Sequence, residues 1–208
     1  MLASADLKTL LVTSPLPNEG KTTSAANSAV IIAQQGKRVL LVDADLRKPV
    51  LHRCFGIPNE CGLSDILLGR VGVEVAMVRP AAVPNLAIIP AGPAQLMPAE
   101  MLGSTKMREL MTLWSEQYDY VIIDTPPVLA VTDAVRLSSQ ADSVLLILRA
   151  GHTTRDALAR TCDLLNQSNV PVLGLVVNGV NFHPAGSYYY GYYPELAKTY
   201  YHDGPPEY

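Results

Sequence analysis

Residues 9–36 read TLLVTSPLPNEGKTTSAANSAVIIAQQG, and this stretch decides the fold class of the chain. It begins with a short apolar run, Thr9–Thr13, which predicts a buried β-strand. Small and apolar residues at helical spacing follow in Thr22–Gln35, and Gly36 comes next as a C-terminal cap. A strand, a tight turn and a helix in direct succession form the first half of a βαβ unit.

The same alternation of strand and helix continues along the chain. Five further apolar runs predict strands: Arg38–Asp43, Leu86–Pro90, Tyr120–Asp124, Val144–Leu148 and Val172–Val177. They are near-continuous rather than alternating, which is typical of parallel strands buried on both faces. We therefore predict an α/β fold, a mainly parallel sheet flanked by helices. The proline-rich stretches Arg79–Pro84 and Pro90–Pro98 are expected to be surface connections.

Composition excludes several classes of protein. With 49% hydrophobic residues among 208, the chain is not disordered over most of its length. No apolar run reaches the roughly 18 residues of a membrane span, and the first residues lack the features of a signal peptide. A net charge of −3 argues against nucleic acid as a partner. We expect a globular cytoplasmic protein.

The turn in Ser14–Thr23, SPLPNEGKTT, has the features of a phosphate-binding loop. Its backbone N–H groups and the start of the helix favour anionic phosphate oxygens. Lys21 would reach the outer phosphates, and Thr22 would offer its hydroxyl to Mg²⁺. The usual pattern has glycine where Pro15 and Asn18 stand, but asparagine tolerates left-handed dihedral angles best after glycine. The predicted nucleotide-binding residues of the loop are Asn18, Glu19, Gly20, Lys21, Thr22 and Thr23.

Two strands end in acidic residues. The segment LLVDADLRKP places Asp43 and Asp45 at the end of the second strand, and YDYVIIDTPP places Asp124 at the end of the fourth. A single strand-end aspartate is often only a helix cap. Three of them beside a phosphate loop, at the carboxyl edge where parallel sheets bind ligands, indicate a magnesium site.

The last residues have a different composition. From residue 188 onward the chain carries eight of its ten tyrosines and almost no aliphatic residues. We predict a core domain, 1–182, and a flexible tyrosine-rich tail, 183–208. One interpretation is a sticky or edge-strand tail, and the other is a set of hydroxyl groups presented to a partner.

These motifs together resemble one family, the bacterial tyrosine kinases of capsule and exopolysaccharide synthesis, relatives of the MinD/ParA-type P-loop ATPases. The resemblance rests on TSPLPNEGKTT, LLVDADLRKP, HRCFGIPNECGLSDILLG, PAGP, PAEMLGS, YDYVIIDTPPV and the tyrosine cluster. The MinD/ParA branch usually has a lysine four residues before the last loop glycine. Leu16 stands there, which favours the kinase branch.

The resemblance implies an ATP- and Mg²⁺-dependent protein-tyrosine autokinase. In this family pattern Lys21 binds the transferred phosphate, Thr22 and Asp45 hold Mg²⁺, and Asp124 holds the water shell of the metal. Asp43 is the candidate for orienting or deprotonating the phenol, and Asn178 resembles the asparagine that contacts adenine. The implied phosphorylation sites are Tyr188, Tyr189, Tyr190, Tyr192, Tyr193, Tyr200, Tyr201 and Tyr208.

The resemblance also implies partners. They are other copies of the chain in a ring, a transmembrane polysaccharide co-polymerase that activates the kinase, and a phosphotyrosine phosphatase. The chain would then act at the inner face of the plasma membrane. The family's assembly helix normally precedes the first strand, where this sequence has only Met1–Asp6.

Two other functions remain open from the sequence. The first is a MinD/ParA-type switch that hydrolyses ATP without phosphorylating tyrosine. The second is a catalytically weak scaffold whose tail binds a partner, an interpretation that the unusual Pro15 and Asn18 keep open.

Overall fold

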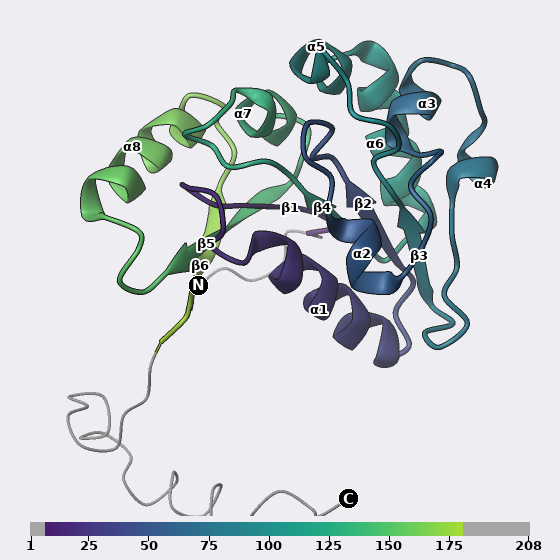
Figure 1. Cartoon of the computed structure of the whole chain (residues 1–208), viewed down its shortest axis with the longest axis horizontal. Helices are drawn as coiled ribbons and strands as arrows, with labels where there is room; N and C mark the ends of the chain where they lie inside the picture. Colours follow the sequence, from purple (N-terminus) through teal and green to yellow (C-terminus); the bar gives the residue numbers. More distant parts are fainter. Residues whose placement is uncertain (1–6, 181–208) are drawn as a thin grey trace, which may run out of the picture. The chain divides into compact units, whose positions relative to one another are not determined.

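The computed structural model of the chain describes residues 7–180, so the predicted tail lies outside the described residues. Six parallel strands form one sheet in the order β3-β2-β4-β1-β5-β6 (Figure 1). Their bounds are β1 Thr9–Thr13, β2 Val39–Asp43, β3 Leu86–Ile89, β4 Tyr120–Asp124, β5 Ser143–Arg149 and β6 Val172–Asn178. The predicted α/β class and all six predicted strands are confirmed.

Helices cover both faces of the sheet (Figure 1). On one face lie α1 Lys21–Gln34 and α2 Leu51–Phe55. On the other lie α3 Leu63–Leu67, α4 Val73–Ala76, α5 Pro98–Leu102, α6 Thr105–Gln117, α7 Asp133–Ser138 and α8 Arg155–Asn166. None of the helices in residues 7–180 combines the length and apolar character that crossing a membrane requires.

Successive residues of the central strands pack on opposite faces of the sheet. Leu41 of β2 packs with Ala25 and Ala29 of α1, whereas its neighbour Leu40 packs in the opposite layer with Trp114 of α6. Both leucines are fully buried. Apolar residues are therefore needed on both faces of each central strand, which explains the near-continuous runs in the sequence.

Strand register brings polar residues together at one edge of the sheet. Asp43 at the end of β2 lies directly opposite Asp124 at the end of β4, and Arg149 of β5 lies opposite Asn178 of β6. The first helix, α1, begins at this same edge, directly after β1. Gly36 follows α1 in a left-handed conformation (φ +84°) and donates to Ala33 O, as expected of a C-terminal cap.

Two expectations are wrong. The run Val172–Val177 was predicted to be buried on both faces, but β6 is an edge strand, and the helices of the described residues leave much of it uncovered. The stretch Pro90–Pro98 is not all surface, because Pro90, Ala91 and Gly92 are buried. They pack against Gly62, where a Cβ atom would overlap the backbone of Pro90 and Gly92.

Candidate active site

The phosphate loop connects β1 to α1. Gly20 precedes the helix with a φ of +91°, and Asn18 has a φ of +63°. The left-handed conformation that the sequence predicts for Asn18 is thus confirmed. A side chain at position 20 would meet the amide of Asn178, since a Cβ built there lies 2.5 Å from Nδ2. Glycine is required at position 20 for both its conformation and its size.

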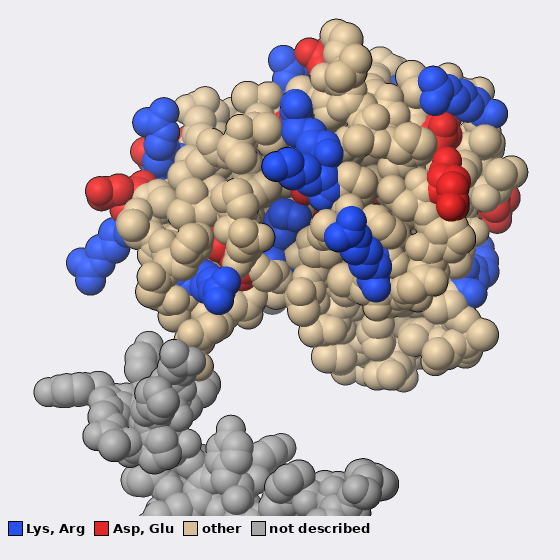
Figure 2. All heavy atoms as spheres, viewed as in Figure 1, with Lys and Arg blue, Asp and Glu red and all other residues tan. Residues whose placement is uncertain are grey.

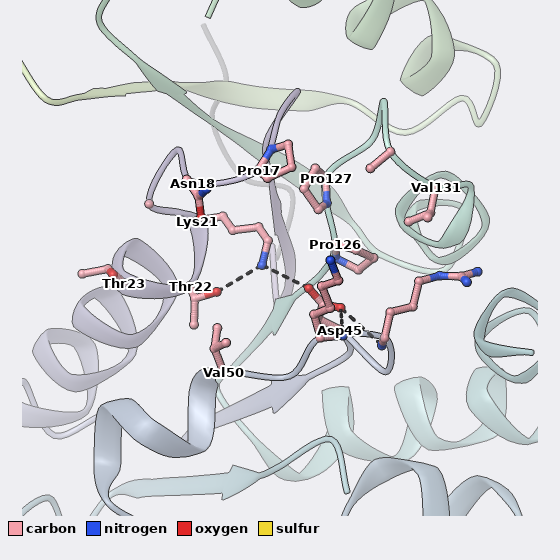
Figure 3. A pocket seen from close by; sticks show the side chains of 14 residues that line it. Pro17, Asn18, Lys21, Thr22, Thr23, Asp45, Val50, Pro126, Pro127 and Val131 are labelled. Atoms are coloured by element: carbon pink, nitrogen blue, oxygen red, sulfur yellow. Dashed lines mark hydrogen bonds and ion pairs between the residues drawn. The ribbon is translucent and has the colours of Figure 1, made fainter. Parts of the chain in front are cut away.

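A cavity of about 620 Å³ opens in front of this loop (Figure 3). Its walls come from three segments: the loop and start of α1, the segment after β2, and the segment after β4. The first two supply Lys21, Thr22 and Asp45. The third supplies mainly apolar surface, from Pro126, Pro127, Ala130 and Val131.

Lys21 lies at the centre of the polar part of the cavity (Figure 3). Its Nζ is 3.5 Å from Asp45 Oδ2, 3.5 Å from Asp124 Oδ1, and donates to Thr22 Oγ1 at 3.1 Å. Burial of these side chains in a low-dielectric site strengthens the attraction. The structure therefore brings together four of the predicted residues, contributed by α1, by the segment after β2 and by the end of β4.

Asp124 differs from the other three residues in the hydrogen bonding of its side chain. Its side chain is completely buried, yet neither carboxylate oxygen has a hydrogen-bond partner in the described part of the chain. Burial raises the pKa of Asp124, and the charge of Lys21 opposes that rise. A buried carboxylate that is paired with Lys21 but accepts no hydrogen bond in the described residues fits a site for a hydrated cation.

The acidic residues do not make a complete metal cage. Within residues 7–180, no three His, Cys, Asp or Glu side chains converge as a set able to hold a metal ion. Mg²⁺ commonly completes its octahedral shell with phosphate oxygens and water, using only one or two carboxylates from the protein. The hydroxyl of Thr22, Asp45 and Asp124 fit that pattern together with a bound nucleotide.

Asp43 lies outside the cavity. It is fully buried, and its two oxygens accept backbone hydrogen bonds from Asp45 N (3.1 Å) and Leu51 N (3.2 Å). Burial, and next the charge of Asp124, raise the pKa of Asp43 well above its usual range. In this structure Asp43 therefore holds the segment after β2 together, and it is not exposed to a substrate.

Glu19 and Asn178 also lie apart from the cavity lining. The Glu19 side chain is turned to Leu16 N and Thr153, and Asn178 Nδ2 donates to Glu19 O at 3.0 Å and to Ser24 Oγ at 3.2 Å. Both residues brace the phosphate loop. The predicted tyrosines, from Tyr188 onward, lie outside the described residues.

An ion pair at the mouth of the cavity was not predicted from the sequence. Arg47 binds Asp133 of α7 through two hydrogen bonds, Nε to Oδ2 at 2.8 Å and Nη2 to Oδ1 at 2.9 Å. Asp133 is fully buried, and the pair raises the pKa of Arg47. Together with Lys48, Arg47 makes the mouth basic, and Figure 2 shows basic side chains gathered over the middle of this face. Such a surface favours anionic ligands.

Comparison with known proteins agrees with this geometry. A family model described as an AAA domain matches residues 18–170. Tyrosine-protein kinase YwqD of Bacillus subtilis is 42% identical over 192 residues, which are 91% of this chain and 81% of YwqD. Putative tyrosine-protein kinase CapB of Staphylococcus aureus is 34% identical and covers 91% of this chain, which spans 83% of CapB. Tyrosine-protein kinase Wzc of Salmonella typhimurium is 38% identical, but the chain spans only 27% of its length.

Solved structures give the same result. The kinase domain of Escherichia coli tyrosine kinase ETK superposes with a TM-score of 0.83 at 33% identity, covering 88% of this chain and 71% of that domain. The cell-division ATPase MinD of Pyrococcus furiosus has a TM-score of 0.70 at 24% identity, covering 82% of this chain and 71% of MinD, which shows a shared fold. With this fold, this loop and these relatives, the chain belongs to the bacterial tyrosine-protein kinases and is a tyrosine kinase of the P-loop type.

Proposed function

We propose that the chain transfers the terminal phosphoryl group of ATP, with Mg²⁺, to tyrosines of its own C-terminal cluster. The observation that carries the proposal is the convergence of Thr22, Asp45 and Asp124 on Lys21, whose side chain lines a cavity beside a phosphate loop. The acceptors are the eight tyrosines of the tail: Tyr188, Tyr189, Tyr190, Tyr192, Tyr193, Tyr200, Tyr201 and Tyr208.

The loop binds the nucleotide through its backbone N–H groups and Lys21. The Lys21 ammonium lies among oxygens of the kind that bind Mg²⁺. With a triphosphate bound, Lys21 would contact the outer phosphates, Thr22 and Asp45 would hold Mg²⁺, and Asp124 would hold the water shell of the metal. The metal supplies charge neutralisation and orientation of the phosphates.

The acceptor phenol enters from the apolar side of the cavity, at Pro126–Val131. Its oxygen forms a bond to the terminal phosphorus while the bond from that phosphorus to the bridging oxygen of ADP breaks. The phenol proton passes to Asp43, a carboxylate of the kind that accepts the hydroxyl proton in phosphoryl transfer. Asp43 reaches the phenol only after it releases Leu51 N, so the proposal requires the segment after β2 to open during the reaction.

The relatives' names suggest the cellular role. They include a putative tyrosine-protein kinase in the cps region of Klebsiella pneumoniae, and a solved neighbour is the chimerical protein CapA2B2. We propose that this chain likewise regulates capsule or exopolysaccharide synthesis, with a membrane-bound activator, a phosphotyrosine phosphatase and other copies of itself as partners.

A mixing experiment tests the transfer between copies. One chain carries Lys21→Met with an intact tail, and the other carries an intact site with all eight tail tyrosines changed to phenylalanine. Incubated together with Mg·ATP, the pair is expected to yield phosphate on the tail of the Lys21→Met chain, detected by mass spectrometry. No phosphotyrosine in the mixture, while unaltered chain phosphorylates itself, would exclude transfer between copies.

A further inference from the structure

The phosphate loop is held in place from one side by the connection between β5 and α8, residues 150–154 together with the end of β5 (Figure 1). Glu19 is 1% exposed although it sits in a loop that binds phosphate. A buried negative charge at such a place opposes anion binding, so its presence calls for a physical reason. The reason lies in its hydrogen bonds.

Both carboxylate oxygens of Glu19 and the backbone carbonyl groups of Asn18 and Glu19 accept hydrogen bonds. Glu19 Oε2 accepts from Leu16 N at 2.8 Å, and Thr153 Oγ1 donates to Glu19 Oε1. Arg149 Nη1 donates to Asn18 O at 3.1 Å. The amide of Asn178 donates to Glu19 O. The turn is thus fixed at four points.

Thr153 is itself held in place by hydrogen bonds to the backbone of Arg149. Its hydroxyl accepts a hydrogen bond from Arg149 N at 2.8 Å, and its own N–H donates to Arg149 O at 2.9 Å. Because Thr153 Oγ1 already accepts from the backbone, its proton is directed to Glu19. The hydroxyl therefore connects the end of β5 to the phosphate loop.

The backbone of the loop needs this support. Asn18 and Gly20 on either side of Glu19 both have left-handed dihedral angles, φ +63° and +91°. An L-residue pays a conformational penalty at such an angle and adopts it only where surrounding contacts impose it. Without the clamp, residues 16–20 would sample other conformations and their N–H groups would no longer converge on phosphate.

We propose that Glu19 and Thr153 form a clamp that sets the affinity of the loop for nucleotide, with Glu19 acting through hydrogen bonds rather than through charge. Both are positioning residues, since neither lines the cavity. The proposal builds on the nucleotide binding proposed above and adds that the β5–α8 connection controls it.

The test is a titration of each variant of the full chain with a fluorescent N-methylanthraniloyl-ADP in the presence of Mg²⁺. Thr153→Val and Glu19→Ala are expected to raise the Kd by about tenfold, which corresponds to the loss of one hydrogen bond to a charged group. Thr153→Val is the decisive variant because it is nearly isosteric and leaves the loop sequence unchanged.

Two further variants separate a clamp from a general loss of stability. Thr154→Val removes the neighbouring hydroxyl, which only caps α8 by accepting from Ala157 N, so it lowers the thermal midpoint without changing the Kd. Glu19→Gln restores most of the affinity lost in Glu19→Ala, since its Oε1 accepts from Leu16 N and its Nε2 donates to Thr153 Oγ1.

The possible failures are distinguishable. If the unaltered chain binds no nucleotide, the proposed function itself is wrong. If the unaltered chain binds and Thr153→Val binds equally well, or Thr154→Val weakens binding as much, the clamp is wrong. If Glu19→Gln binds nucleotide as weakly as Glu19→Ala, Glu19 does not act through its hydrogen bonds.

Discussion

At the scale of single residues, burial of the Asp124 carboxylate lowers the stability of the folded protein. The carboxylate is fully buried and accepts no hydrogen bond from residues 7–180, and its pKa is raised despite Lys21 at 3.5 Å. The raised pKa means that the folded protein disfavours the charged form. The charged form of Asp124 therefore lowers the stability of the folded protein, although the proposed reaction uses this residue.

We predict that Asp124→Asn stabilises the nucleotide-free protein at pH 8 by about 1 kcal/mol or more, because a buried charge without hydrogen bonds is costly. The same change should abolish tyrosine phosphorylation. The measurement is urea unfolding without nucleotide. Asp163→Asn, at an exposed position of α8, is the control and should leave the free energy of unfolding unchanged.

The stabilisation by Asp124→Asn should also depend on pH. An acid with a raised pKa in the folded state binds more protons folded than unfolded, so its contribution to stability is full below its unfolded pKa. That contribution is lost as pH rises through the folded pKa. The advantage of Asp124→Asn over the unaltered chain should therefore be larger at pH 8 than at pH 4.5. A constant or opposite difference would show that Asp124 is not destabilised by burial.

At the scale of the loop between β1 and α1, Asn18 takes a conformation that other side chains adopt only with strain. Asn18→Ala should lower the free energy of unfolding by about 1 kcal/mol and weaken nucleotide binding, whereas Asn18→Gly should retain both. Asn169, which has a φ of +54° in the turn after α8, provides a matched control. Asn169→Ala should cause a similar loss of stability without a change in nucleotide affinity, measured by titration alongside chemical unfolding.

At the scale of neighbouring elements, the Arg47–Asp133 pair connects the segment after β2 to α7. Asp133→Asn is expected to lower the free energy of unfolding by about 2 kcal/mol, because the fully buried carboxylate accepts two hydrogen bonds from one guanidinium. Asp119 also accepts two hydrogen bonds from one arginine, one from the backbone N–H of Arg38 and one from its guanidinium, but this pair lies on the surface. Asp119→Asn should therefore have a much smaller effect in the same urea titration, and equal effects would show that burial of Asp133 does not matter.

At the scale of the whole molecule, periodicity predicted the sheet well because both faces of the central strands are buried. The polar residues in the runs around Leu11, Leu41 and Ile122 stand only at the ends of the strands, so each run is apolar in its interior. The same rule failed at β6, since a sequence does not say which strand lies at the edge. Its apolar Leu175 and Val177 are exposed in the described part of the chain.

The residues of the candidate site could be predicted from the sequence only where they lie at the ends of strands. Asp45 and Asp124 converge because parallel register aligns β2 with β4, which the sequence allowed us to anticipate. The partners of Glu19 and Arg47 were not predictable, because Thr153 and Asp133 lie 134 and 86 residues away along the chain. Nor did any local signal indicate that Asp43 would be sealed beneath the segment after β2.

The central claim is that this site transfers phosphate to tyrosine. The most direct measurement incubates the dephosphorylated chain with Mg·ATP, follows phosphate release, and locates phosphate by mass spectrometry. We predict phosphotyrosine within residues 188–208, formed by the unaltered chain and absent from Lys21→Met. Steady release of phosphate with no phosphotyrosine formed would contradict the account and identify an ATP-hydrolysing switch.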